Sequence, residues 1–246
     1  MVLRKTSAGA VAAFVTVALT GLVGCDSGKT SNDSRSFDFS GQKLTIDIDG
    51  PGLSVIPGGT DSSIEVDRTL KGSADGNASW SLENGTLKLA VDCSGIVVTC
   101  ESKHTVKVPR TTRIVLKGSG SKVEIRGMSG GLTATMRDAP LKIVDPSGDL
   151  DLKTVGESTV VTGARSRNVT AEARSDGRVQ LSFAAAPERV VAATTEGNLT
   201  VQLPGGPETY RIDAPKNSGT VASDRASKRT VDVSSNSGRV RVTKAR

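Results

Sequence analysis

The sequence predicts an all-β protein whose simplest architecture is a β-solenoid, a single-stranded, β-helix-like stack of repeats of about 20 residues each. Three observations predict this class: short runs alternate between apolar and polar residues, glycine is frequent (27 of 246 residues), and the alternating runs recur at near-constant spacing. Val, Thr and Ser fill these runs, which disfavours a helical bundle built from Leu, Ala, Glu and Lys. A β-sandwich or meander, in which the same runs pair as hairpins, is the alternative.

Residues 1–24 have the pattern of a bacterial lipoprotein signal peptide. A short basic start (Arg4 and Lys5) precedes an uncharged run of apolar and small residues that is too short for a membrane span. Residues 22–25 (LVGC) have the form of a lipobox, which predicts that the Cys25 thiol receives a diacylglycerol before cleavage. Two or more acyl chains hold a protein stably on a membrane, so we expect an extracytoplasmic protein anchored to the bacterial cell membrane by its N-terminal lipid. An ordinary secretory signal with an incidental cysteine is the alternative.

Residues 25–36 include the polar stretch DSGKTSNDSRS and predict a flexible tether, because they show no apolar pattern. Residues 37–110 contain strand-like but irregular runs: Lys43–Ile48, Ser63–Asp67, Thr86–Val91 and Thr105–Pro109. Asn84-Gly85, between two alternating runs, is a two-residue hairpin signal. We expect this part to cap a repeat body formed by residues 111–246, because a terminal repeat must hide its open sheet edge. Residues 37–246 then form one continuous domain.

From residue 132 onward the chain repeats a unit of strand, turn, strand and linker. The first strands of successive units start near Leu132, Leu150, Val169, Val190, Tyr210 and Val231, at steps of 18, 19, 21, 20 and 21 residues. Most units turn at a small or polar corner, such as Asp176-Gly177 or Ser237-Gly238, and a second alternating run follows. Each unit has too few apolar side chains on one face to exclude water alone, so neighbouring units must stack.

Cys93 and Cys100 remain once Cys25 is assigned to the lipid. An exported protein meets oxidising conditions, so we expect a disulfide between them. A metal site is the alternative, but two thiols with His104 fall short of the four ligands of a structural zinc. A redox pair is disfavoured because the spacing is not Cys-x-x-Cys.

The net charge of +6 is concentrated towards the C-terminus, where residues 211–246 contain nine basic residues against three acids. The residues that we expect to bind an anionic partner there are Arg225, Lys228, Arg229, Arg239 and Arg241. Such a surplus attracts phospholipid headgroups or cell-wall polymers. A solvated end without a partner is the alternative. Nucleic acid is not an expected partner, because an exported protein with 2% aromatic residues has few rings to stack on bases.

No combination of residues predicts catalysis, a metal site or a cofactor. His104 is the sole histidine, and no Gly-x-Ser-x-Gly motif is present to form a catalytic triad with it. We therefore expect a non-catalytic histidine, exposed at a strand end. Glycosidase chemistry needs two carboxylates across a sugar. The acids that lie close in sequence, Asp145, Asp149, Asp151 and Glu157, are spread over turns without aromatic residues to stack on a sugar.

The repeats resemble those of the bacterial family of β-strand-repeat putative adhesins. The resemblance is carried by Val108-Pro109, by Tyr210–Asp213 followed by Asn217-Ser218-Gly219, and by Val231–Val233 followed by Asn236–Val240. It extends from about Gln42 to Thr243, although Met136–Pro140 lacks the Ser-Gly corner of the other repeats. It implies an extracytoplasmic, β-helix-like body without established catalytic residues.

The sequence therefore predicts a non-enzymatic, adhesin-like protein, anchored by lipid at the bacterial cell surface, that presents rows of polar side chains to a surface protein or cell-wall polymer. One alternative is an envelope-associated sensor or accessory protein that binds anionic wall or membrane components. A second is a polysaccharide-active enzyme on a β-helix.

Overall fold

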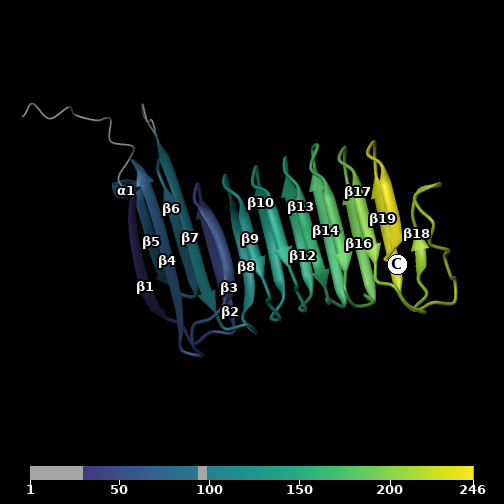
Figure 1. The fold of residues 1–246 in the computed structure, drawn as a ribbon, viewed down its shortest axis with the longest axis horizontal. Helices are drawn as coiled ribbons and strands as arrows, with labels where there is room; N and C mark the ends of the chain where they lie inside the picture. Colours follow the sequence, from purple (N-terminus) through teal and green to yellow (C-terminus); the bar gives the residue numbers. More distant parts are fainter. Residues whose placement is uncertain (1–29, 94–98, 246) are drawn as a thin grey trace, which may run out of the picture.

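The computed structural model describes residues 30–93 and 99–245, which form two ten-stranded sheets along an elongated body (Figure 1). Sheet A contains, in spatial order, β1 (Thr30–Asp38), β4 (Ser63–Gly72), β7 (Cys100–Val108), β3 (Gly52–Pro57), β9 (Val123–Arg126), β11 (Leu141–Val144), β13 (Thr159–Ala164), β15 (Val179–Phe183), β17 (Leu199–Leu203) and β20 (Val240–Lys244). Sheet B contains β18 (Arg211–Asp213), β19 (Thr230–Ser235), β16 (Arg189–Thr194), β14 (Asn168–Arg174), β12 (Leu150–Val155), β10 (Leu132–Arg137), β8 (Arg113–Ser119), β2 (Lys43–Asp49), β6 (Thr86–Val91) and β5 (Ala78–Glu83). One short helical turn, α1 (Ala74–Asn77), connects β4 to β5.

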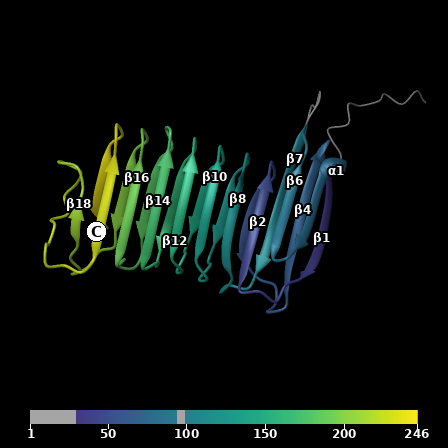
Figure 2. The same ribbon diagram turned by 180° about the vertical axis from the view of Figure 1, so that it is seen from behind.

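Successive strands of the repeat region alternate between the two sheets. β10 of sheet B is followed by β11 of sheet A, and each pairs in parallel with the strand two positions later, β12 or β13. The register places Leu132 beside Leu150 and Leu141 beside Thr159, so neighbouring units repeat the same pattern. The two strands of one unit thus lie in opposite sheets instead of pairing as a hairpin, as the rear view also shows (Figure 2).

The alternating runs fill the space between the sheets with ladders of buried apolar side chains. In sheet B the ladder runs through Ile46, Leu116, Ala134, Leu152, Ala171, Ala192 and Val233. In sheet A it runs through Val55, Ile125, Ile143, Val161, Leu181, Val201 and Val242. The period-two alternation turns every other side chain of a strand into this core and leaves the polar ones on the two outer faces.

Corner glycines let neighbouring units approach closely. A Cβ atom at Gly197 would lie 2.0 Å from the carbonyl oxygen of Gly177, and one at Gly238 would lie 2.0 Å from that of Gly197. These three glycines therefore stack on one another, and a larger residue at Gly197 or Gly238 would collide with the backbone of the adjacent unit.

The order of the strands departs from the sequence order at the C-terminal end. The 18–21-residue steps predict that β18 follows β16 in the stack, but β16 pairs instead with β19, and β18 lies outside β19. In sheet A, Gly219 forms a bridge with Val242 on the outer side of β20. The segment between β17 and β19 is thus an internal insertion that covers the last unit, which alternation alone could not reveal because β18 has the same pattern as a stacking strand.

The opposite end is closed by antiparallel strands. β4 pairs antiparallel with β7, β1 with β4, and β5 with β6. The β5–β6 hairpin turns at Asn84-Gly85, both with positive φ (49° and 69°), which confirms the hairpin signal. The division at residue 110 stays a prediction, and β2 pairs with β8 across it.

The expected flexible tether is wrong from Thr30 onward, because residues 30–36 belong to β1. This strand is polar and exposed, so apolar periodicity could not identify it. Its stability comes from backbone pairing with β4 along nine residues, with Phe37 as its buried side chain.

Candidate functional site

The predicted signal peptide and the lipidation site Cys25 lie outside the described residues. Within residues 30–93 and 99–245, no helix is long and apolar enough to cross a membrane. In the same residues, no three His, Cys, Asp or Glu side chains gather closely enough to hold a metal ion.

His104 is buried inside β7, with an exposed fraction of 0%, so its expected position at an exposed strand end is wrong. β7 lies between β3 and β4 and turns His104 into the core, where its ring meets that of Trp80 edge-on with centroids 6.4 Å apart. Neither ring nitrogen has a hydrogen-bond partner among the described residues. Burial, together with the positive charge of Arg68, lowers the pKa of His104 to about 4. The imidazole is therefore neutral at pH 7 and has no contact with solvent.

Arg68 on β4 covers the Trp80 ring that contacts His104. The Arg68 guanidinium lies over the Trp80 ring, 4.1 Å from its centroid. Its Nε and Nη2 atoms contact Oδ2 of Asp33 on β1 at 2.9 and 2.8 Å. This ion pair joins β1 to β4 while the guanidinium shields the aromatic ring from water.

Glu157 lies apart from the other acids weighed for glycosidase chemistry. Asp145 and Asp149 lie in the corner that precedes β12, whereas Glu157 lies in the corner that follows it, and a six-residue strand spans about 20 Å. Asp149 also accepts hydrogen bonds from the backbone N–H and Nδ2 of Asn168 at 3.1 and 3.0 Å. Glu157 therefore lies farther from Asp145 and Asp149 than the 5–10 Å typical of a glycosidase pair, and Asp151 lies within β12 itself.

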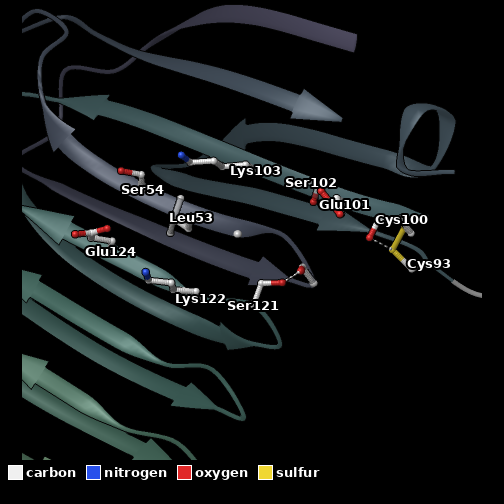
Figure 3. A pocket seen from close by; sticks show the side chains of 12 residues that line it. Leu53, Ser54, Cys93, Cys100, Glu101, Ser102, Lys103, Ser121, Lys122 and Glu124 are labelled. Atoms are coloured by element: carbon white, nitrogen blue, oxygen red, sulfur yellow. Dashed lines mark hydrogen bonds between the residues drawn. A yellow bond between two sulfur atoms is a disulfide. The ribbon is translucent and has the colours of Figure 1, made fainter. Parts of the chain in front are cut away.

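Cys93 and Cys100 form the predicted disulfide, with Cα atoms 5.9 Å apart. It links the end of β6 in sheet B to the start of β7 in sheet A, at a position where most later units have a short corner with glycine. A hollow of about 430 Å³ lies beside it, with Lys103, Lys122 and Glu124 on its wall (Figure 3). Charges of both signs line this hollow, so it offers no preference for an anion or a cation.

The five predicted anion-binding residues do not form one cluster. Arg239 directly precedes β20, and Arg241 lies within it on the outer face of sheet A. Lys228 and Arg229 precede β19 of sheet B, and Arg225 lies further back in the insertion. Arg229 donates from Nη1 to the carbonyl oxygens of Ala186 and Pro187 at 3.2 and 3.1 Å, which gives it a structural role.

Arg239 and Arg241 line a hollow of about 520 Å³ at the C-terminal end of the molecule. The insertion supplies the other wall with Asn217, Ser218, Gly219 and Thr220, and β20 adds Thr243. The wall thus combines two guanidinium groups with hydroxyl and amide groups. We take this hollow as the candidate functional site.

Arg178, which was not among the residues predicted to bind an anion, lies at a position equivalent to that of Arg239. The backbone N–H groups of Val179 and Leu199 bond to Asn198 and Arg239, so residues 178, 198 and 239 occupy equivalent positions before β15, β17 and β20. The signal was present, because Gly177-Arg178-Val179 and Gly238-Arg239-Val240 have the same three-residue motif at equivalent corners.

No protein-family model matches this chain, and no curated protein matches it. Several solved structures align with most of this chain. A "putative adhesin" from Bacteroides fragilis has 16% identity and a TM-score of 0.42, with 87% of this chain and 97% of that chain covered. A "putative adhesin" from Parabacteroides merdae has 10% identity and a TM-score of 0.38, with 89% and 97% covered. A "putative cell adhesion protein" from Clostridium sporogenes has 13% identity and a TM-score of 0.37, with 88% and 100% covered. These descriptions apply to those proteins.

Proposed function

We propose that the protein is a non-enzymatic, adhesin-like contact protein of the bacterial cell surface, held there by a lipid on Cys25. The observation that supports this function most is the form of the body: two ten-stranded sheets whose outer faces carry exposed rows of polar side chains. Such broad faces suit contact with a large partner, whereas enzymes usually enclose a substrate in a deeper cleft.

We also propose that the repeat region is a β-solenoid in which each coil contributes one strand to each sheet. The parallel registers support this architecture, because β8, β10, β12, β14 and β16 follow one another in sheet B, and β9, β11, β13, β15 and β17 in sheet A. In this architecture the antiparallel strands around residues 30–108 and the insertion before β19 act as caps.

The lipid would hold the body near the membrane. β1 begins at Thr30, five positions after Cys25, so little chain separates the proposed anchor from the folded body. Metabolic labelling with palmitate tests the anchor: we expect the wild-type chain to be labelled and a Cys25→Ala variant to lose the label. A label that persists in the variant would contradict the lipid anchor. It would not bear on the contact function, which is tested separately by bead attachment.

The contact function is tested by coupling the full chain to beads and measuring their attachment to intact bacterial cells. We expect saturable attachment that the free chain inhibits, with the same result for the Cys25→Ala variant, because the body rather than the lipid makes the contact. Attachment no stronger than that of beads carrying an unrelated protein would contradict the proposal.

A further inference from the structure

The Arg239–Arg241 hollow has the arrangement of an anion site. Arg239 directly precedes β20 and Arg241 lies within it, and the N–H of Leu199 bonds to the carbonyl oxygen of Arg239, so the pairing with β17 extends to this residue. Side chains two positions apart on such an extended chain leave the same face of a sheet about 7 Å apart. Both residues are exposed. Neither guanidinium has an acidic partner among the described ion pairs, whereas Arg68, Arg126, Arg165, Arg167 and Arg174 each have one.

Neutral hydrogen-bonding groups surround the two guanidiniums. The segment 217–220 lies along the free edge of β20, where the N–H of Val242 donates to the carbonyl oxygen of Ser218 at 2.6 Å. A Cβ on Gly219 would lie 1.9 Å from the carbonyl oxygen of Val242, so this segment fits against β20 only with glycine there. Close packing thus holds the hydroxyl groups of Ser218 and Thr220 beside the arginines.

The sheet surface next to the hollow contains no acid that would repel an anion. β13, β15 and β17 contain no charged residue, and their outward side chains are Val160, Thr162, Gln180, Ser182, Thr200 and Gln202. Strands β12, β14, β16 and β19 of sheet B all carry charged residues. The nearest corner acids, Asp176 and Glu196, precede β15 and β17 and are not part of the wall of the hollow.

Arg178 continues the positive row along the stack. It occupies the position of Arg239 two strands away, which corresponds to about 10 Å at the usual spacing of paired strands. Asn198 lies between them. The cations are therefore spaced along the axis of the stack instead of converging on one point.

We propose that the outer face of sheet A at Arg178, Arg239 and Arg241 binds a chain polymer that carries phosphate groups. The forked guanidinium matches two oxygens of a phosphate, and the hydroxyl and amide groups of the hollow are placed to bind its remaining oxygens. The spacing along the stack fits successive phosphates of a chain better than a single small anion. The inference rests on the proposed function only for the location of the polymer at the cell surface.

Titration of the full chain with inorganic polyphosphate at low salt tests this site. We expect R239Q/R241Q to bind about tenfold more weakly than the wild type, because two charge-assisted contacts are lost. R178Q should weaken binding about threefold, since the phosphates at the hollow remain held. Both changes replace exposed side chains, so the melting temperature should stay that of the wild type.

R225Q/K228Q is the matched control, because it also removes two positive charges from the C-terminal end of the molecule but leaves Arg239 and Arg241 in place. Its affinity should stay within about twofold of the wild type. Equal weakening in both double variants would show attraction by net charge alone and overturn the site, as would an unchanged affinity in R239Q/R241Q.

Vesicles identify the source of the phosphate. If R239Q/R241Q also loses binding to phosphatidylglycerol vesicles relative to phosphatidylcholine vesicles, the arginines bind lipid headgroups, and the proposal of a chain polymer is overturned. If vesicle binding is unchanged while polyphosphate binding falls, the partner is a wall polymer. The proposed site and the proposed adhesive function can fail separately. If beads do not attach to cells but polyphosphate binding is weakened by R239Q/R241Q and R178Q as expected, the adhesive function is contradicted and the phosphate site is supported.

Discussion

His104 shows how a single side chain makes the fold sensitive to acid. Its ring is buried among apolar and aromatic groups without hydrogen-bond partners in the described chain. Burial lowers its pKa from 6.5 to about 4 in the folded protein, whereas the unfolded chain keeps the ordinary value. Protons therefore bind the unfolded state more tightly between these two values, and stability falls as the pH drops below about 6.5.

We expect His104→Leu to remove this part of the acid sensitivity. The loss of unfolding free energy between pH 7 and pH 4 should be smaller than in the wild type by about 3 kcal/mol, since each pKa unit corresponds to roughly 1.4 kcal/mol. Urea denaturation at both pH values measures the difference. The carboxyl groups of Asp67 and Glu124 have pKa values lowered by nearby lysines and arginines, so they also destabilise the fold in acid. Their contribution is the same in the wild type and the variant and cancels in the difference between the two proteins. Equal pH dependence in the two proteins would contradict the burial of a neutral imidazole.

The Cys93–Cys100 corner is the element at which a covalent bond replaces the stacked glycines of later units. The chain between β6 and β7 spans residues 92–99, a longer connection than the three- or four-residue corners at the equivalent positions further along the stack. A longer loop has more conformations to lose on folding, and the disulfide removes part of that freedom from the unfolded chain.

A Cys93→Ser/Cys100→Ser variant should lose roughly 2–3 kcal/mol of unfolding free energy by the chain-entropy relation. Thermal unfolding with and without reductant provides the control. The wild type should fall to the variant's melting temperature in reductant, and the variant should not change. A wild type that is indifferent to reductant would show that the bond does not stabilise this corner.

The sequence predicted individual elements better than their order. Alternation identified β10, β12, β14, β16 and β19 because each buries every second side chain. It missed β1, which is held by backbone pairing rather than by an apolar face. It placed β18 inside the stack because a strand's pattern states which face is buried but not which neighbour it pairs with. Two of the three arginines of the candidate site, Arg239 and Arg241, were predicted from the sequence. Arg178 was not, because it is far from them in sequence and only the stacking of β15, β17 and β20 brings it near them.

At the scale of the whole molecule, both ends of the two sheets are covered by segments from within the chain. Lys244 holds the C-terminal insertion by donating from Nζ to the carbonyl oxygens of Gly206 and Glu208 at 2.9 and 2.7 Å. Tyr210, at the start of this insertion's strand, is buried against the core. An uncovered stack would expose strand edges and apolar side chains that pair with other molecules.

Replacing residues 205–228 with a three-residue Gly/Ser linker should therefore cause self-association. The new connection would match the length of the 184–188 linker between β15 and β16 while uncovering β19 and β20. Light scattering after size-exclusion chromatography should show a larger mass per particle than for the wild type. R225Q/K228Q, which keeps the insertion, should behave as the wild type. A deletion variant with the same number of chains per particle as the wild type would contradict the capping role.

The order of strands at the C-terminal end is the central claim, because the hollow, the cap and the row of arginines all depend on it. Val191, Asp232 and Asp213 are aligned side by side on β16, β19 and β18. Paired strands are about 4.8 Å apart, within the Cα separation of a disulfide, and two such steps exceed it.

The most direct test is oxidative cross-linking of two full-length cysteine pairs in a Cys25→Ala background, read by mass spectrometry under non-reducing conditions. We predict that V191C/D232C forms a disulfide and V191C/D213C does not. Cross-linking of V191C/D213C with no bond in V191C/D232C would mean that the strands stack in sequence order, and it would contradict this account.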